Sequence, residues 1–180
     1  DIFFNRIPFL NPLTHENYIK MADHITETTN QILPNEKVDV VAYGCTSGTI
    51  EIGEERIKSE IHKSKSDALI TTPITAAIKA FKLSNFKKIA VLTPYPKEVN
   101  IKVYDYLIKQ GFEIKSFSSF NLNYDSEIAK VTPDSLIQSI SSIDLGEIDC
   151  LFVSCTALKI LDLIEDLEEN LKTNIISSNQ

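Results

Sequence analysis

The stretch VDVVAYGCTS at residues 38–47 decides the fold, because a related stretch, IDCLFVSCTA, follows at residues 148–157. Each copy has an apolar residue, an aspartate, four largely apolar residues, a small residue, Cys-Thr and another small residue. Two buried strands share apolar composition by coincidence, but the shared spacing from aspartate to Cys-Thr is harder to explain that way. We interpret the two stretches, whose cysteines lie 110 residues apart, as an internal repeat that predicts two similar lobes.

Short apolar runs alternate with longer amphipathic stretches along the whole chain. The predicted strands are Asp1–Asn5, Val38–Tyr43, Asp67–Thr71, Lys88–Thr93, Glu113–Phe120, Ile148–Ser154 and Asn174–Ser177. The predicted helices are His15–Leu33, Thr49–His62, Ile74–Phe81, Pro96–Gln110, Pro133–Ser142 and Ala157–Asn170. Strands that alternate with helices predict an α/β fold, in which mostly parallel sheets are flanked by helices.

The repeat also predicts where the lobes meet. We expect a first lobe over residues 1–84 and a second over residues 85–180. The second lobe starts with KIAVLT and a helix ahead of its strand EIKSFSSF, whereas the first starts directly at DIFFN. A helix follows the strand at ITTPITAAIKAF, but its counterpart NIISSNQ has none after it. We therefore expect the first lobe to lack its N-terminal strand and helix, and the second lobe its last helix.

Composition narrows the classes of partner. The net charge is −7 and the isoelectric point is about 5.0, which argues against a nucleic-acid or anionic-membrane surface. No apolar run approaches the roughly 20 residues of a membrane-spanning helix. Three cysteines, an odd number, do not form a secreted disulfide framework, so we expect reduced thiols and a cytoplasmic protein.

Cys45 and Cys155 each end a predicted strand ahead of a predicted helix. Ligands of parallel α/β sheets bind at the carboxyl ends of strands, where helix N-termini offer free N–H groups. Such a position lowers the pKa of a thiol and holds a substrate carboxylate, and Thr46, Ser47 and Thr156 add hydroxyl donors. Two thiols that face each other suit proton transfer, or attack, at a carbon beside a carboxylate. This chemistry requires no metal or organic cofactor.

Two other groups of residues give weaker indications of a binding site. Gly48 and Gly53 have the glycine spacing of a phosphate loop, but Glu54 and Glu55 follow in place of Lys-Ser/Thr. Arg6 follows the first predicted strand on the ligand-binding side. The sequence favours a surface role for Arg6 and leaves open that it pairs with a substrate carboxylate.

The motifs YGCTSGT, VSCTAL, TTPITAA and LTPYPKEVN resemble those of the aspartate/glutamate racemase superfamily, closest to its maleate isomerase and arylmalonate decarboxylase branch. The long stretch from NPLTHENY to GEERI is similar to ectoine-utilisation protein A. The resemblance covers nearly the whole chain. It implies two pseudo-symmetric lobes, an active site in the cleft between them, and cofactor-independent chemistry by paired cysteines.

By this resemblance, Cys45 and Cys155 are the catalytic pair and Tyr95 contacts the substrate. The substrate carboxylate takes donors from the Cys-Thr turns, which comprise Thr46, Ser47, Thr156 and Ala157. A further contact comes from an asparagine within FNLNYDSEIAK; Asn123 is the expected residue, and Asn121 remains an alternative. The branch also uses a residue that follows a strand ahead of this chain.

The resemblance implies an isomerase or racemase that acts on a small carboxylate or amino-acid-like substrate, in ectoine or hydroxyectoine breakdown. Arylmalonate decarboxylases have glycine in place of the first cysteine, so Cys45 favours isomerisation over decarboxylation. Two alternatives remain: a carboxylate-binding sensor or accessory protein without turnover, and a decarboxylase or lyase that uses Cys155 alone. We expect a homodimer.

Overall fold

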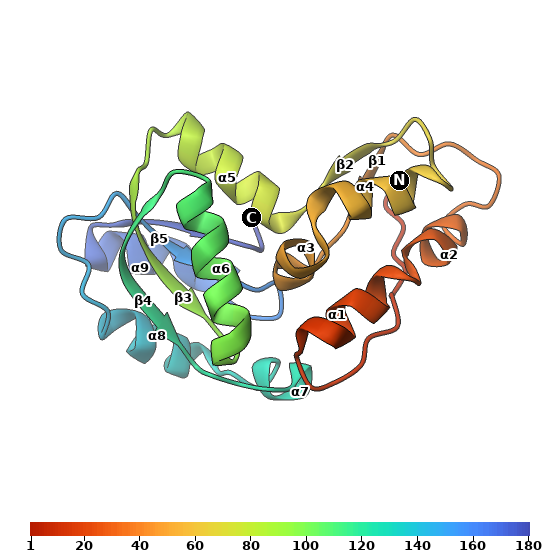
Figure 1. Ribbon diagram of the computed structural model, residues 1–180. Helices are drawn as coiled ribbons and strands as arrows, with labels where there is room; N and C mark the ends of the chain where they lie inside the picture. The colour runs from red at the N-terminus through yellow and green to blue at the C-terminus, as the bar shows by residue number, and fades with distance from the viewer.

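The computed structural model describes all 180 residues and contains two parallel β-sheets flanked by helices (Figure 1). The strands are β1 (Val40–Ala42), β2 (Leu69–Thr71), β3 (Lys88–Thr93), β4 (Glu113–Ser119), β5 (Cys150–Val153) and β6 (Asn174–Ser177). The helices are α1 (His15–Ala22), α2 (Ile25–Asn30), α3 (Thr46–Ile52), α4 (Glu54–His62), α5 (Pro73–Leu83), α6 (Lys97–Lys109), α7 (Asp125–Ile128), α8 (Pro133–Ser141) and α9 (Ile164–Leu171), with a 3₁₀ turn, η1, at Leu161–Leu163. The predicted α/β class is confirmed.

The larger sheet has the strand order β4-β3-β5-β6, and every neighbouring pair is parallel. Its central strands β3 and β5 are almost entirely buried, which explains their continuous apolar sequences KIAVLT and CLFV. Helices lie on both faces of this sheet, with α6 in front and α9 behind in Figure 1. One hydrophobic cluster of 35 buried residues runs from this sheet into the helices of the smaller one.

The smaller sheet contains only β1 and β2, paired in parallel. A cavity of about 850 Å³ separates the free edge of β1 from residues 1–5. The predicted strand Asp1–Asn5 is therefore wrong, because a strand needs a neighbour to bond with and these residues have none. Ile2 and Phe4, which the prediction placed in this strand, are 82% and 90% exposed.

Two predicted helices are each divided in the structure. The expected helix Thr49–His62 breaks at Gly53, whose φ of +92° suits glycine and ends α3 before α4 begins. The expected helix His15–Leu33 breaks into α1 and α2 at a tightened turn, where the Asp23 N–H bonds to the carbonyl of Lys20. Because α1 packs on α3 and α2 packs on α4, the two breaks lie beside each other.

The chain after β5 also differs from the expectation. Residues 157–160 are not helical, so the predicted helix Ala157–Asn170 begins only at η1 and α9. The short helix α7 has no counterpart among the predicted elements. β3 and β6 have the predicted bounds, and α8 begins as predicted, with the Thr132 hydroxyl accepting from the Ser135 N–H.

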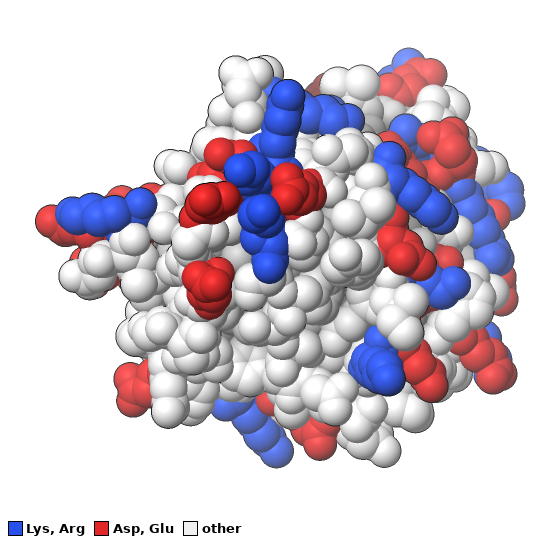
Figure 2. Space-filling view, turned by 60° about the vertical axis from the view of Figure 1, so that its left-hand side comes forward, with Lys and Arg blue, Asp and Glu red and all other residues white.

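The surface carries charges of both signs. On the face in Figure 2, Lys and Arg side chains lie next to Asp and Glu side chains. Pairs such as Lys37–Asp67 and Lys20–Glu16 are exposed, so each contributes little to stability. None of the helices has both the length and the apolar character that a membrane crossing requires.

Candidate active site

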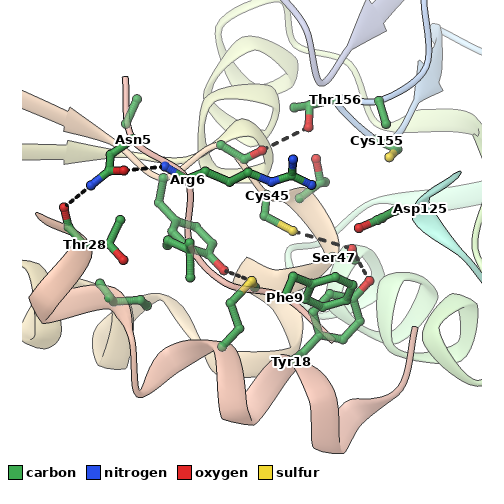
Figure 3. A pocket seen from close by; sticks show the side chains of 18 of the residues that line it. Asn5, Arg6, Phe9, Tyr18, Thr28, Cys45, Ser47, Asp125, Cys155 and Thr156 are labelled. Atoms are coloured by element: carbon green, nitrogen blue, oxygen red, sulfur yellow. Dashed lines mark hydrogen bonds between the residues drawn. The ribbon is translucent and has the colours of Figure 1, made fainter. Parts of the chain in front are cut away.

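A cavity of about 660 Å³ opens where β1 and β5 end, between the two sheets. Both Cys45 and Cys155 line it, and Figure 3 shows their sulfur atoms on the walls of the same space. Five further residues from the sequence prediction line the same cavity: Thr46, Ser47, Tyr95, Thr156 and Ala157. The repeat therefore brings both Cys-Thr turns to one opening, as the parallel-sheet argument predicts.

Cys45 is the N-cap residue of α3. Its sulfur accepts the Gly48 N–H at 3.3 Å and lies 3.9 Å from the Ser47 hydroxyl, which in turn bonds to the Tyr18 hydroxyl at 2.8 Å. A Cβ at Gly48 would stand 2.9 Å from this sulfur and 2.7 Å from the hydroxyl of Tyr43. Glycine at this position thus permits the close approach of the helix backbone to the thiol.

Cys155 has a φ of +104°, a conformation that costs a residue with a Cβ about 1–3 kcal/mol. The turn that follows it brings the Ala157 N–H near its sulfur, and both this N–H and the Tyr95 hydroxyl act to lower the pKa of the thiol. Tyr95 is fully buried and its hydroxyl lies 3.3 Å from that of Ser154. Unlike Cys45, Cys155 does not cap a helix, so the expected helix dipole is missing on this side.

Ser178 connects the two Cys-Thr turns. Its hydroxyl accepts both the Thr46 hydroxyl at 2.9 Å and the Cys155 N–H at 3.0 Å. The Thr156 hydroxyl donates to the carbonyl of Gly44 at 3.0 Å, which adds a second link. Sequence reasoning missed Ser178. The available signal was its position directly after β6, at the same end of the sheet as Cys155.

The predicted low pKa of the thiols is wrong. Burial raises the pKa of Cys155 to about 12, although the Ala157 N–H and the Tyr95 hydroxyl act in the opposite direction. Burial also raises the pKa of Cys45, against the smaller effects of the Gly48 N–H and the Ser47 hydroxyl. The loss of water around a buried thiolate outweighs the local donors. Both thiols are therefore protonated at neutral pH in the free protein.

The asparagine that we expected to contact the substrate lies outside the cavity. Asn123 does not line the cavity; its N–H donates to the Glu127 carboxylate and its carbonyl accepts the Leu13 N–H. Asp125, two residues further on, lines the cavity instead, and Arg6 extends into it from the other side (Figure 3). Nothing in the spacing of FNLNYDSEIAK distinguished Asp125, because α7, which fixes its direction, was not foreseen.

Comparison with known proteins agrees with this architecture. The family model described as arylmalonate decarboxylase matches residues 6–180, and the chain belongs to this family. The maleate isomerase of Geobacillus stearothermophilus is 24% identical over 168 residues, which are 89% of this chain and 67% of that protein. The maleate isomerase of Alcaligenes faecalis is 19% identical over 168 residues, 89% of this chain and 66% of that protein. The chain thus spans about two thirds or less of the curated relatives that it matches.

Solved structures have the same fold. A maleate isomerase from Pseudomonas putida S16 with maleate superposes with a TM-score of 0.85 at 22% identity, covering 94% of this chain and 71% of that one. A Nocardia farcinica maleate cis-trans isomerase variant with a covalently bound succinylcysteine intermediate gives a TM-score of 0.84 at 20% identity, covering 94% and 72%. These neighbours agree with a two-lobe α/β arrangement of parallel sheets.

Proposed function

We propose that this chain carries the active site of a cofactor-independent isomerase that acts on a carbon beside the carboxylate of a small substrate, through Cys45 and Cys155. One observation carries the proposal: two thiols from repeated turns line one cavity, each beside its own hydroxyl and N–H donors. The related maleate isomerases support isomerase chemistry, and the succinylcysteine intermediate bound to one of them supports chemistry by a cysteine.

The raised pKa values define the starting state of the reaction. A negative charge on Cys45 raises the pKa of Cys155, because two thiolates repel each other. The pair therefore holds one thiolate at most, and the other cysteine stays a thiol. For proton transfer, one cysteine first loses its own proton to solvent, and the resulting thiolate takes the proton from one face of the carbon. The opposite thiol gives its proton to the other face and becomes the thiolate. For cis-trans isomerisation, the thiolate forms a C–S bond to one alkene carbon, and the electron pair of the C=C bond moves to the neighbouring carbon and into its carboxylate. The C–C bond, now single, rotates, and the electron pair returns to re-form the double bond and expel the thiolate.

Cysteine variants test the proposal on the full protein. Cys45→Ala and Cys155→Ala should each abolish turnover, whereas Cys150→Ala, which removes a buried thiol inside β5, should retain it. Solvent deuterium that enters the substrate carbon distinguishes proton transfer from C–S addition, which leaves that carbon unlabelled. Full activity of both active-site variants would refute the proposed function.

A second candidate is a decarboxylase or lyase that uses Cys155 alone, and the family model supports it. Cys45→Gly distinguishes the two, because a decarboxylase retains activity and releases carbon dioxide, while an isomerase loses activity. A third candidate binds a carboxylate without turnover and serves as a sensor or accessory protein. Tight ligand binding with no product would favour that third candidate.

The biological setting is also a proposal. The similarity of the stretch from NPLTHENY to GEERI to ectoine-utilisation protein A supports a role in the breakdown of ectoine or hydroxyectoine. We propose a cytoplasmic protein with lobes at residues 1–84 and 85–180, since the three cysteines are free and the sheets fall on either side of residue 84. We also propose a homodimer, because homodimers are common among symmetric assemblies. Metabolite analysis of a deletion strain grown on ectoine tests the role.

A further inference from the structure

The cavity that holds Cys45 and Cys155 carries one positive and one negative side chain. Arg6 and Asp125 are the only charged residues among the 26 that line it; the others are apolar or neutral polar groups. Figure 3 shows Arg6 entering from the side of Asn5 and Asp125 facing the same space from the opposite wall. The lining therefore has no net formal charge.

Neither charged group has a partner in the protein. The Asp125 N–H donates to the side chain of Asn11, but no hydrogen bond or ion pair engages the Asp125 carboxylate. Only the backbone of Arg6 is bonded, to the Asn5 side chain, and its guanidinium is likewise free. Two unpaired opposite charges that face one space fit a ligand that carries both signs.

We propose that Asp125 makes this site select a substrate with one carboxylate and one cationic nitrogen over a dicarboxylate. Arg6 receives the substrate carboxylate, and Asp125 receives the nitrogen. This inference rests on the proposed function, because it names the substrate class of the same cavity. A second carboxylate would meet the charge of the partly buried Asp125 carboxyl group, and this repulsion disfavours a dicarboxylate.

The charge on Asp125 also bears on the thiols. Arg6, Cys45, Cys155 and Tyr18 are the titratable groups that interact with it across the cavity. Burial raises the pKa of Asp125, and Arg6 acts against that rise. A bound ammonium group would keep Asp125 ionised and reduce its repulsion of a thiolate, so the favoured substrate would itself help to form the nucleophile.

Calorimetry on the full protein with matched ligands tests the assignment without turnover. β-Alanine and succinate differ only by an ammonium in place of a carboxylate, as do 4-aminobutyrate and glutarate. The wild-type protein should bind at least one amino acid about tenfold to a hundredfold tighter than its paired dicarboxylate, the range of a charge-assisted hydrogen bond. Asp125→Asn should remove or reverse that preference, and Arg6→Gln should weaken both classes.

Asp134→Asn is the matched control, because it removes the same charge from an exposed site on α8 and should leave the preference unchanged. Equal binding of both classes by the wild-type protein, no binding of either, or loss of both classes in Asp125→Asn would overturn the assignment. The proposed function fails separately, through active Cys45→Ala and Cys155→Ala variants, because the binding comparison needs neither thiol.

Discussion

The backbone at Cys155 predicts an unusual response to glycine. At a position with a negative φ, a protein with glycine is less stable than one with alanine by about 0.5–1 kcal/mol, because glycine gives the unfolded chain more conformational freedom. Cys150, which lies inside β5 and has no positive φ, should follow this rule. Cys155 has a φ of +104°, where alanine carries a strain of about 1–3 kcal/mol that glycine does not. Cys155→Gly should therefore be about 1 kcal/mol more stable than Cys155→Ala.

Urea unfolding of four variants measures this difference. At each site, the free energy of unfolding of the glycine variant is compared with that of the alanine variant. Both variants lack the thiol, so its loss does not affect the difference, and the two sites serve as controls for each other. We expect opposite signs at the two cysteines, with a double difference of about 1.5–2 kcal/mol. If glycine is the less stable residue at both positions by similar amounts, the strain at Cys155 is not real and the argument from it fails.

Three further predictions follow from the site and the sheet. Ser178→Ala should lower the free energy of unfolding by about 1–3 kcal/mol in urea, because a threonine hydroxyl and the Cys155 N–H lose their acceptor. Alkylation of Cys45 and Cys155 by iodoacetamide should be slow at pH 7 and accelerate above pH 9. Asp125→Asn should move the dependence of both alkylation rates on pH to lower pH. A fast reaction at pH 7 would contradict the raised pKa values. Two backbone N–H groups lower the pKa of Asp149 in the folded protein. The carboxylate therefore adds to the free energy of unfolding above its unfolded pKa of about 3.9, and this addition is lost as pH falls through the pKa of the folded protein. Asp149→Asn should thus destabilise the protein at pH 7, by a deficit that shrinks below pH 4 in thermal unfolding.

The alternation of apolar runs with amphipathic stretches allowed the sheet class to be predicted, because burial on both faces of a central strand leaves a continuous apolar run. The repeat allowed the position of the thiols to be predicted. The repeat also contains an aspartate in each copy, Asp39 and Asp149, and these two residues lie in different surroundings in the structure. The Asp149 carboxylate accepts the N–H groups of Lys87 and Lys88 at 2.7 and 2.8 Å, which joins β5 to the start of β3. Asp39 lies beside the free edge of β1, next to the larger cavity, where no strand offers such donors. A sequence pattern records the residue but not the presence of its partner.

The chemistry of the thiols could not be predicted from local motifs, because their pKa depends on how much water the whole fold excludes. A helix N-terminus lowers the pKa of an exposed thiol, but burial here reverses the sign for Cys45 and Cys155. Neutral thiols and a strained backbone at Cys155 are both compatible with the proposed active site. For the proposed function, protonated thiols avoid reaction with other molecules until a substrate binds, and a strained backbone persists where the surrounding structure holds it in place. The structure thus points to Cys155 as the residue whose position the surrounding turns, Ser178 and Tyr95 are built to hold.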